Sequence, residues 1–217
     1  MRTGAHVSRV AAFIAAVFTA GCLASMPTKQ PAGPTLTESI NTRVRDAGAF
    51  PWSSKRPLAW TDFKGQPPRE SPAAAETAYI LLHGVQCAGS AAGSAFEYRV
   101  VAAFRPDHSW VRPEILKRPA DSARALRHEQ THFDLTEVHA RRLRRYFMEL
   151  VAPCKSSNGD LSQVAERYVR DEANAQTKYD DETDHGRKAP EQARWDKEVD
   201  SQLFATTRYI SPGNGRQ

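Results

Sequence analysis

Two histidines and a glutamate stand close together in the segment His128-Glu129-Gln130-Thr131-His132. Histidines four residues apart share one face of a helix, so both imidazoles can bind a single zinc ion. Glu129 is placed to take a proton from a zinc-bound water, whose pKa zinc lowers toward ~7, and to return that proton later. The alternative is a surface helix with two solvated histidines. The spacing, on a predicted helix in a chain with an export signal, favours a zinc-dependent hydrolase.

A catalytic zinc site needs a third protein ligand and one open position. On a regular helix, Glu137 points away from the predicted zinc face, and His139 lies roughly 10 Å beyond the second histidine. We therefore expect the third ligand to come from a separate segment. His185, in a polar run after a predicted helix, is the first choice, and Asp184 or Glu182 is the fallback.

A hydroxyl group near the zinc can stabilise the oxyanion that forms when a carbonyl is attacked. Tyr179, shortly before the polar run that holds His185, is the candidate for this catalytic role. The alternative is a tyrosine that packs against a helix end. Glu137 and Arg141, four residues apart, are expected to form a structural ion pair.

The helix that carries the histidines is predicted to run from Ser122 to Val151, with Asp121 as its cap and Pro153 beyond its end. Before it, two segments rich in strand-forming residues flank a stretch of Ala, Gly and Ser and are predicted to form a hairpin. The hairpin strands are predicted at 77–85 and 96–104, and a further short strand at 109–111. Two more helices are predicted at 161–178 and 189–204. This order indicates an α+β fold, in which N-terminal antiparallel strands precede an active-site helix and two further helices.

The first residues have the layout of a secretory signal. Arg2 and Arg9 precede the apolar run 10–20, which is too short to span a bilayer comfortably, and small residues follow. The run ends Thr19-Ala20-Gly21-Cys22, which resembles a bacterial lipobox, except that the usual leucine is replaced by threonine. We expect residues 1–21 to be a lipoprotein-type signal peptide and Cys22 to be lipidated, with ordinary cleavage and secretion as the alternative. A lipidated Cys22 would anchor the protein to a membrane surface without a spanning helix.

The composition is that of one water-facing domain with appendages. The chain has 217 residues, a mean hydropathy of −0.59 and a dispersed net charge of +5, which gives no case for nucleic-acid binding. We expect a tether or loosely ordered arm at 22–55 and a frayed tail at 205–217. Cys87 and Cys154 remain once Cys22 is set aside. They can form a disulfide in an oxidising compartment, but their spacing alone does not decide whether they do.

Several short motifs occur together in this chain. They are Leu58-x-Trp60-x-Asp62-Phe63-x-Gly65, Ser109-Trp110, Arg127-His128-Glu129-Gln130-Thr131-His132-Phe133-Asp134, Glu137, Ala140-Arg141, Tyr179-Asp180-x-x-Thr183-x-His185-Gly186 and Gln192-x-x-Trp195. Over residues 56–204 the chain thereby resembles a bacterial family of predicted secreted zinc-dependent proteases, long catalogued as a domain of unknown function. The resemblance implies a zincin-like metallopeptidase domain, with His128 and His132 as zinc ligands and Glu129 as the base.

These expectations converge on a zinc peptidase of the bacterial envelope, held in the periplasm or at the outer membrane by its lipid anchor, or else secreted. Its substrate would be a peptide or a protein. A noncatalytic envelope lipoprotein with a structural zinc site is one alternative, and a zinc amidase that acts on cell-wall material is another. Three protein ligands plus water would indicate an enzyme, whereas four protein ligands would indicate a structural site.

Overall fold

The computed structural model describes residues 33–90 and 93–210, and those from Pro34 onward belong to the unit Pro34–Gln217. The helices are α1 (Leu36–Asp46), α2 (Pro113–Leu116), α3 (Pro119–Glu149), α4 (Asn158–Thr183) and α5 (Ala189–Ala205). The strands are β1 (Phe50–Pro51), β2 (Ala75–Glu76), β3 (Tyr79–Ser90), β4 (Gly93–Phe104) and β5 (Trp110–Val111). Short 3-10 turns lie at η1 (Trp60–Asp62), η2 (Pro106–His108), η3 (Pro153–Lys155) and η4 (Thr207–Tyr209). The mixed α+β class with antiparallel strands is confirmed.

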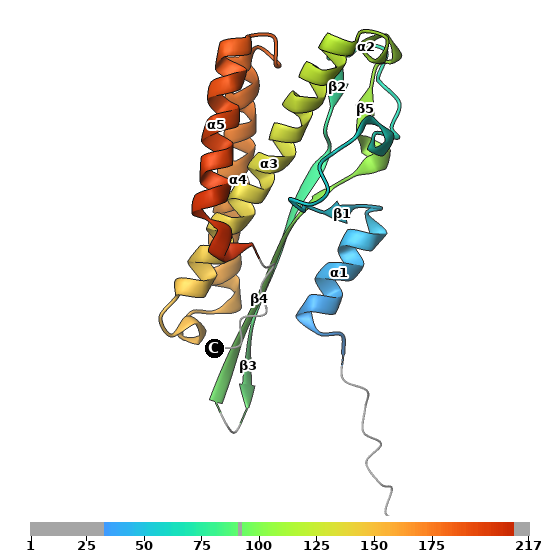
Figure 1. The fold of residues 1–217 in the computed structure, drawn as a ribbon. Helices are drawn as coiled ribbons and strands as arrows, with labels where there is room; N and C mark the ends of the chain where they lie inside the picture. Colours follow the sequence, from blue (N-terminus) through green and yellow to red (C-terminus); the bar gives the residue numbers. More distant parts are fainter. Residues whose placement is uncertain (1–32, 91–92, 211–217) are drawn as a thin grey trace, which may run out of the picture. The chain divides into compact units, whose positions relative to one another are not determined.

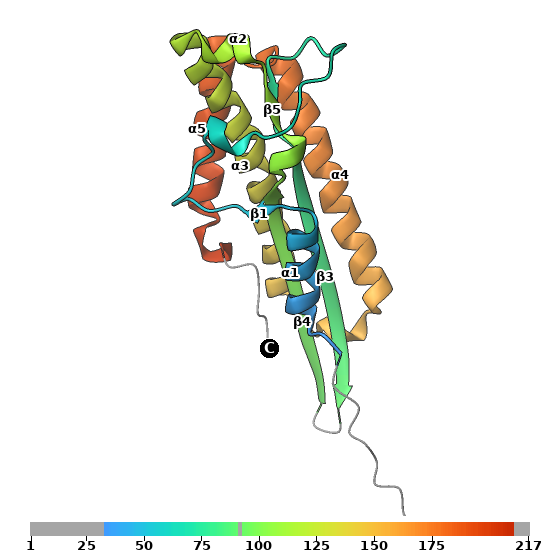
Figure 2. The same ribbon diagram turned by 90° about the vertical axis from the view of Figure 1, so that its right-hand side faces the viewer.

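The predicted hairpin is the centre of this unit. β3 and β4 pair antiparallel from Tyr79 opposite Phe104 to Ser90 opposite Gly93, and β1 adds to the other edge of β4. Both strands extend further into the Ala/Gly/Ser stretch than expected. α1 covers one face of the hairpin, while α3 and α4 lie over the other (Figures 1 and 2). A second, two-stranded sheet pairs β2 with β5.

The expectation of a loosely ordered arm at 22–55 is wrong for its second half, because α1 forms there. Thr35 and Glu38 make a capping box at its start. Ile40 and Val44 lie one turn apart and pack on Val101 and other residues of the hairpin. Gly84 allows this close approach, since a Cβ there would lie 2.7 Å from the Leu36 side chain of α1. The apolar pattern of this helix has only two buried positions, Ile40 and Val44, and is therefore a weak signal in a segment that contains prolines.

α3 is the predicted histidine-bearing helix and packs on two sides. It begins at Pro119 without a side-chain cap, and Asp121 pairs instead with Arg118 and Arg124. One side of α3 packs on the hairpin and on the start of α4, and the other on α4 and α5. The residues of the first contact are Phe96, Tyr98, Val100, Ala102, Ala140, Leu143, Phe147, Leu161 and Ala165. Those of the second are Leu135, Val138, Tyr179, Trp195 and Val199. This double burial fixes the rotation of α3 about its axis.

Two further expectations concern the cysteine pair and the C-terminal tail. Cys87 and Cys154 form a disulfide that joins β3 to the connection between α3 and α4. The tail expected to fray from 205 is structured as far as 210, because η4 follows α5 and the Arg144 guanidinium donates to Tyr209 O at 3.1 Å. Residues 211–217 lie outside the described part.

The predicted signal peptide 1–21 and the lipidation site Cys22 also lie outside the described residues. Within the part of the chain that the structure describes, no helix combines the length and the apolar character needed to cross a membrane.

Candidate metal centre

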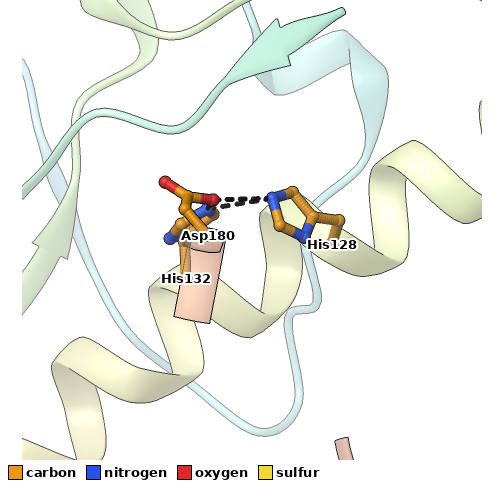
Figure 3. A group of neighbouring side chains, drawn as sticks. All are labelled: His128, His132 and Asp180. Atoms are coloured by element: carbon orange, nitrogen blue, oxygen red, sulfur yellow. Dashed lines mark hydrogen bonds and ion pairs between the residues drawn. The ribbon is translucent and has the colours of Figure 1, made fainter. Parts of the chain in front are cut away.

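α3 and α4 bring His128, His132 and Asp180 together. Asp180 Oδ1 lies 3.1 Å from His128 Nε2 and 3.0 Å from His132 Nε2, and the two Nε2 atoms are 3.2 Å apart (Figure 3). Both histidines are buried and Asp180 is half-buried. The two residues that sequence analysis chose as ligands on α3 therefore do face one point, and α4 supplies a carboxylate to it.

Asp180, not His185, completes this group. α4 continues to Thr183, so position 180 is still helical and faces α3. His185 follows in a left-handed conformation (φ 52°), with its side chain 61% exposed and its Nδ1 3.5 Å from Asp180 Oδ1. In the structure, Asp180 and not the expected third ligand His185 lies with His128 and His132. His185 lies beside the group without belonging to it.

The two fallback ligands, Asp184 and Glu182, form contacts with other residues. Asp184 pairs with Arg187, and Glu182 accepts from Arg194 and from the indole of Trp195. The turn that follows is set by Gly186, which has a φ of 74° and lies against His128, where a Cβ would come within 3.0 Å of the imidazole. Glycine is needed there both for the backbone conformation and for the close contact.

The other ring nitrogen of each histidine is held by a glutamine. His132 Nδ1 is 2.7 Å from Gln176 Oε1, and His128 Nδ1 is 3.0 Å from Gln192 Oε1. The orientation of both amides is fixed, because their NH₂ groups donate at 2.6 and 2.7 Å to carboxylates of Glu172 and Asp196. Since the glutamine oxygens can only accept, each Nδ1 must carry the proton. In a neutral imidazole the lone pair is then on Nε2, the atom that faces Asp180.

Three acceptor atoms therefore point at one another and need a cation between them. Zinc bonds of 2.0–2.1 Å in a tetrahedron place ligand atoms about 3.3 Å apart, close to the observed separations of 3.0–3.2 Å. A proton can serve in the absence of a metal. Burial lowers the pKa of His132, but Asp180 and Glu129 more than offset this and the pKa is raised. The group His128, His132 and Asp180 can hold a metal ion.

Asp180 is electrostatically suited to the site. Burial on its own raises the pKa of this carboxyl, but hydrogen bonds with His128 and His132, which require a proton between the facing atoms, outweigh it and bring the pKa far below the usual range. Asp180 is therefore ionised at neutral pH and can act as an anionic ligand. A metal ion held by these three atoms would have to displace any proton between them.

Glu129 lies beside the group, and its Oε2 has no hydrogen-bond partner although it is buried. The residue is 4% exposed, and burial raises the pKa of its carboxyl. Glu129 and the three metal-site residues line a cavity of about 500 Å³, together with residues 73–77 around β2. A buried carboxylate oxygen without a donor has a strong tendency to take up a proton.

Tyr179 is not placed as an oxyanion donor. It is fully buried, its ring stacks on His128 with centroids 4.7 Å apart, and its hydroxyl donates to His128 O at 3.2 Å. The packing alternative is thus the correct one, and Tyr179 does not line the cavity. Tyr79, from β3, is a tyrosine that does. Burial, with the negative charges of Glu172 and Asp180, raises the pKa of its phenol, so the hydroxyl keeps its proton.

Neither Asp180 nor the two glutamines was expected from the sequence to belong to this site. One signal was available, because Glu172, Gln176 and Asp180 are spaced by four and form a polar stripe along α4. Gln192 and Asp196 repeat the spacing on α5. A buried polar stripe opposite a histidine-bearing face indicates residues that hold the ligands.

The fold and the site together define an α+β protein with a buried two-histidine, one-carboxylate group that can hold a metal. Residues 113–186 match a family described as "Bacterial protein of unknown function (DUF922)". The match runs from α2 through α3 and α4 to Gly186 and so contains all three residues of the group. No curated protein and no solved structure matches the chain.

Proposed function

We propose that this chain is a zinc-dependent hydrolase with Glu129 as its general base, and that its substrates are peptides. One observation carries the proposal: three acceptor atoms converge, with both Nδ1 atoms already committed as donors, beside a buried carboxylate oxygen that has no partner. Two histidines and one carboxylate are a common ligand set of hydrolytic zinc sites.

Zinc held by His128, His132 and Asp180 would polarise a scissile carbonyl and lower the pKa of water. Glu129 would accept the proton of the attacking water at its free Oε2 and deliver it to the leaving group. Its burial and raised pKa suit both steps, because a general base works best with a pKa near the operating pH. Tyr79 stands in the same cavity as a protonated donor for the developing oxyanion.

The peptide class of substrate is supported by β2. This strand pairs with β5 alone in its sheet, and residues 73–77 around it line the cavity beside the metal-site residues. A strand with a free edge can bind an extended peptide through main-chain hydrogen bonds. The described lining of the cavity carries the carboxylates of Glu76, Glu129 and Asp180, which favours neutral or basic peptides over acidic ones.

A noncatalytic protein with a structural zinc is the rival proposal. Structural sites have four protein ligands, whereas the group found among the described residues has three and opens on a cavity. A hydrolase of cell-wall amides would use the same chemistry and differs only in the substrate. We place the protein in the bacterial envelope, anchored through Cys22, on the strength of the leader sequence.

The test is cleavage of a peptide library by the zinc-loaded protein, compared with Glu129→Gln. Glutamine keeps the size of the side chain and loses its basicity, so hydrolysis should fall by about 10²–10⁴-fold while zinc stays bound. Glu149→Gln makes the same change at an exposed position of α3 and should cleave like the wild type. Equal rates in the Glu129→Gln variant would exclude Glu129 as the base. Cleavage of cell-wall fragments but no peptides would select the amidase.

A further inference from the structure

The contacts behind the two histidines form a repeated pattern. Behind His132, the Gln176 amide donates to Glu172 Oε1 at 2.6 Å, and Thr136 of α3 donates to the same oxygen at 3.1 Å. Gln176 Nε2 also donates to His132 O at 3.0 Å. The chain of contacts thus leaves α3 at the imidazole, crosses to α4, and returns to α3 at a threonine one turn after the histidine.

The same arrangement lies behind His128 on a different helix. The Gln192 amide of α5 donates to Asp196 Oδ1 at 2.7 Å, and Thr131 of α3 donates to that oxygen at 2.8 Å. Arg127 pairs with the other Asp196 oxygen at 2.9 Å. In both cases glutamine and carboxylate are four residues apart, and the glutamine is about 5% exposed.

We infer that Glu172–Gln176 and Asp196–Gln192 are two positioning relays that hold His132 and His128 as neutral ligands with the lone pair on Nε2. This inference rests on the proposed function, because it assigns these residues a role toward its metal. Each amide relays the negative charge of the carboxylate to the imidazole without placing an anion in direct contact with its Nδ1. The imidazole is oriented by a hydrogen bond, and its Nδ1 keeps the proton.

The physical reason is the cost of the alternative tautomer. If a proton moved from Nδ1 to Nε2, the buried Nδ1 would face a glutamine oxygen with two acceptors in contact. The glutamine cannot turn its NH₂ inward, because it would lose its bond to the carboxylate and bring its own oxygen against that negative charge. Outer hydrogen bonds of this kind typically change metal affinity 10–100-fold when removed.

The test uses Gln176→Met and Gln192→Met, which keep an unbranched side chain of similar length and remove the amide. Gln130→Met is the matched control. Gln130 is a glutamine of α3 that accepts from Leu58 N at 2.7 Å and donates to Asp134 at 2.8 Å, and it contacts neither histidine. All three variants lose an amide bonded to a carboxylate, so a purely structural role would affect them alike.

Two readouts are needed. Zinc affinity, measured by competition with a chelator, should fall 10–100-fold in the Gln176 and Gln192 variants and stay within about twofold in Gln130→Met. The second readout is the tautomer of each imidazole in ¹⁵N-labelled, metal-free protein at a pH where both are neutral. In Gln192→Met, His128 alone should become a mixture of Nδ1–H and Nε2–H tautomers. In Gln176→Met, His132 alone should do so.

Unchanged zinc affinity, or Nδ1 protons that persist in both variants, would overturn the relays. A wild type that binds no zinc would refute the proposed function. The spectra of the metal-free wild type would still test the relays, because a proton fixed on each Nδ1 supports them and a mixture of tautomers overturns them. If a methionine variant does not fold, Gln192→Glu and Gln176→Glu keep an oxygen opposite Nδ1 and should keep the tautomer. Loss of the tautomer in those variants would count against the relays.

Discussion

α3 contributes to two buried polar clusters, which differ in whether their hydrogen-bond donors and acceptors are matched. In the ionic cluster, the Glu137 carboxylate accepts from Arg141 at 2.8 Å and from Arg144 at 2.8 and 3.1 Å, and all three side chains are at most 3% exposed. The remaining guanidinium donors reach main-chain carbonyls, such as those of Val100 and Leu203. Donors and acceptors are matched within the protein, so this cluster needs no ligand.

In the metal cluster, by contrast, acceptors meet acceptors. His128, His132 and Asp180 place three acceptor atoms within 3.2 Å of one another, and Glu129 adds an oxygen without a partner. The ionic cluster and the two histidines lie buried on the same helix, whereas Asp180 is half-buried on α4. What separates the two clusters is the balance of donors and acceptors: it is complete in the ionic cluster, whereas the metal cluster has acceptors that a metal ion can bind.

The largest expected effect breaks the ionic cluster. Glu137→Leu leaves Arg141 and Arg144 buried without a counter-ion, and removing one partner of a buried ion pair costs about 3–5 kcal/mol of unfolding free energy. Chemical denaturation measures this. Glu149→Leu, at the exposed pair with Arg145 on the same helix, should change stability little. A Glu137→Leu protein as stable as the wild type would mean that the ionic cluster does not hold α3 in place.

The next effect fills the metal cluster. Zinc that binds only the folded state should raise the unfolding free energy by about 2.7 kcal/mol at 100 times its Kd, and by about 4.1 at 1,000 times. Thermal unfolding with and without zinc measures the shift. It should vanish in the double variant His128→Ala/His132→Ala. His185→Ala, which removes an exposed imidazole outside the group, should keep it. Loss of the shift in His185→Ala would restore His185 as a ligand.

The smallest effect concerns His139, a third polar group of α3, which lies outside both clusters and whose Nε2 is 3.4 Å from an Arg142 nitrogen. His139 is buried, its Nδ1 has no partner, and burial with the nearby Arg142 lowers its pKa from 6.5 to about 4. The folded state therefore disfavours the protonated form. Its contribution to stability is complete above pH ~6.5 and is lost as the pH falls toward ~4, with an upper limit of about 3 kcal/mol.

Stability curves of wild type and His139→Leu between pH 4 and pH 7 check this prediction. The difference between the curves isolates His139 from other groups that titrate in the same window, including His132 and Glu129, whose pKa values are raised. The wild type should lose stability relative to the variant as the pH falls. Parallel curves would show that His139 does not carry this part of the acid sensitivity.

Much of the architecture followed from local sequence signals. The hairpin, α3 and α5 were predicted close to their observed bounds, because strand-forming runs, helical periodicity and proline boundaries act over a few residues. α1 was missed, since its two buried positions, Ile40 and Val44, are a weak signal between prolines. Its stability comes from contact with the hairpin, which a local pattern does not reveal.

The candidate site divides in the same way. By itself, the sequence determined that His128 and His132 face one point and that Glu129 is beside them, because the helix fixes the relation of residues one and four apart. Only the tertiary structure decided that Asp180 completes the group. That choice depends on how far α4 extends and on its rotation relative to α3, both of which are set by packing around Tyr179 and other residues far apart in the chain. The glutamines that hold the imidazoles belong to α4 and α5 for the same reason, since side chains 44 and 64 residues away meet the histidines only after the helices have packed.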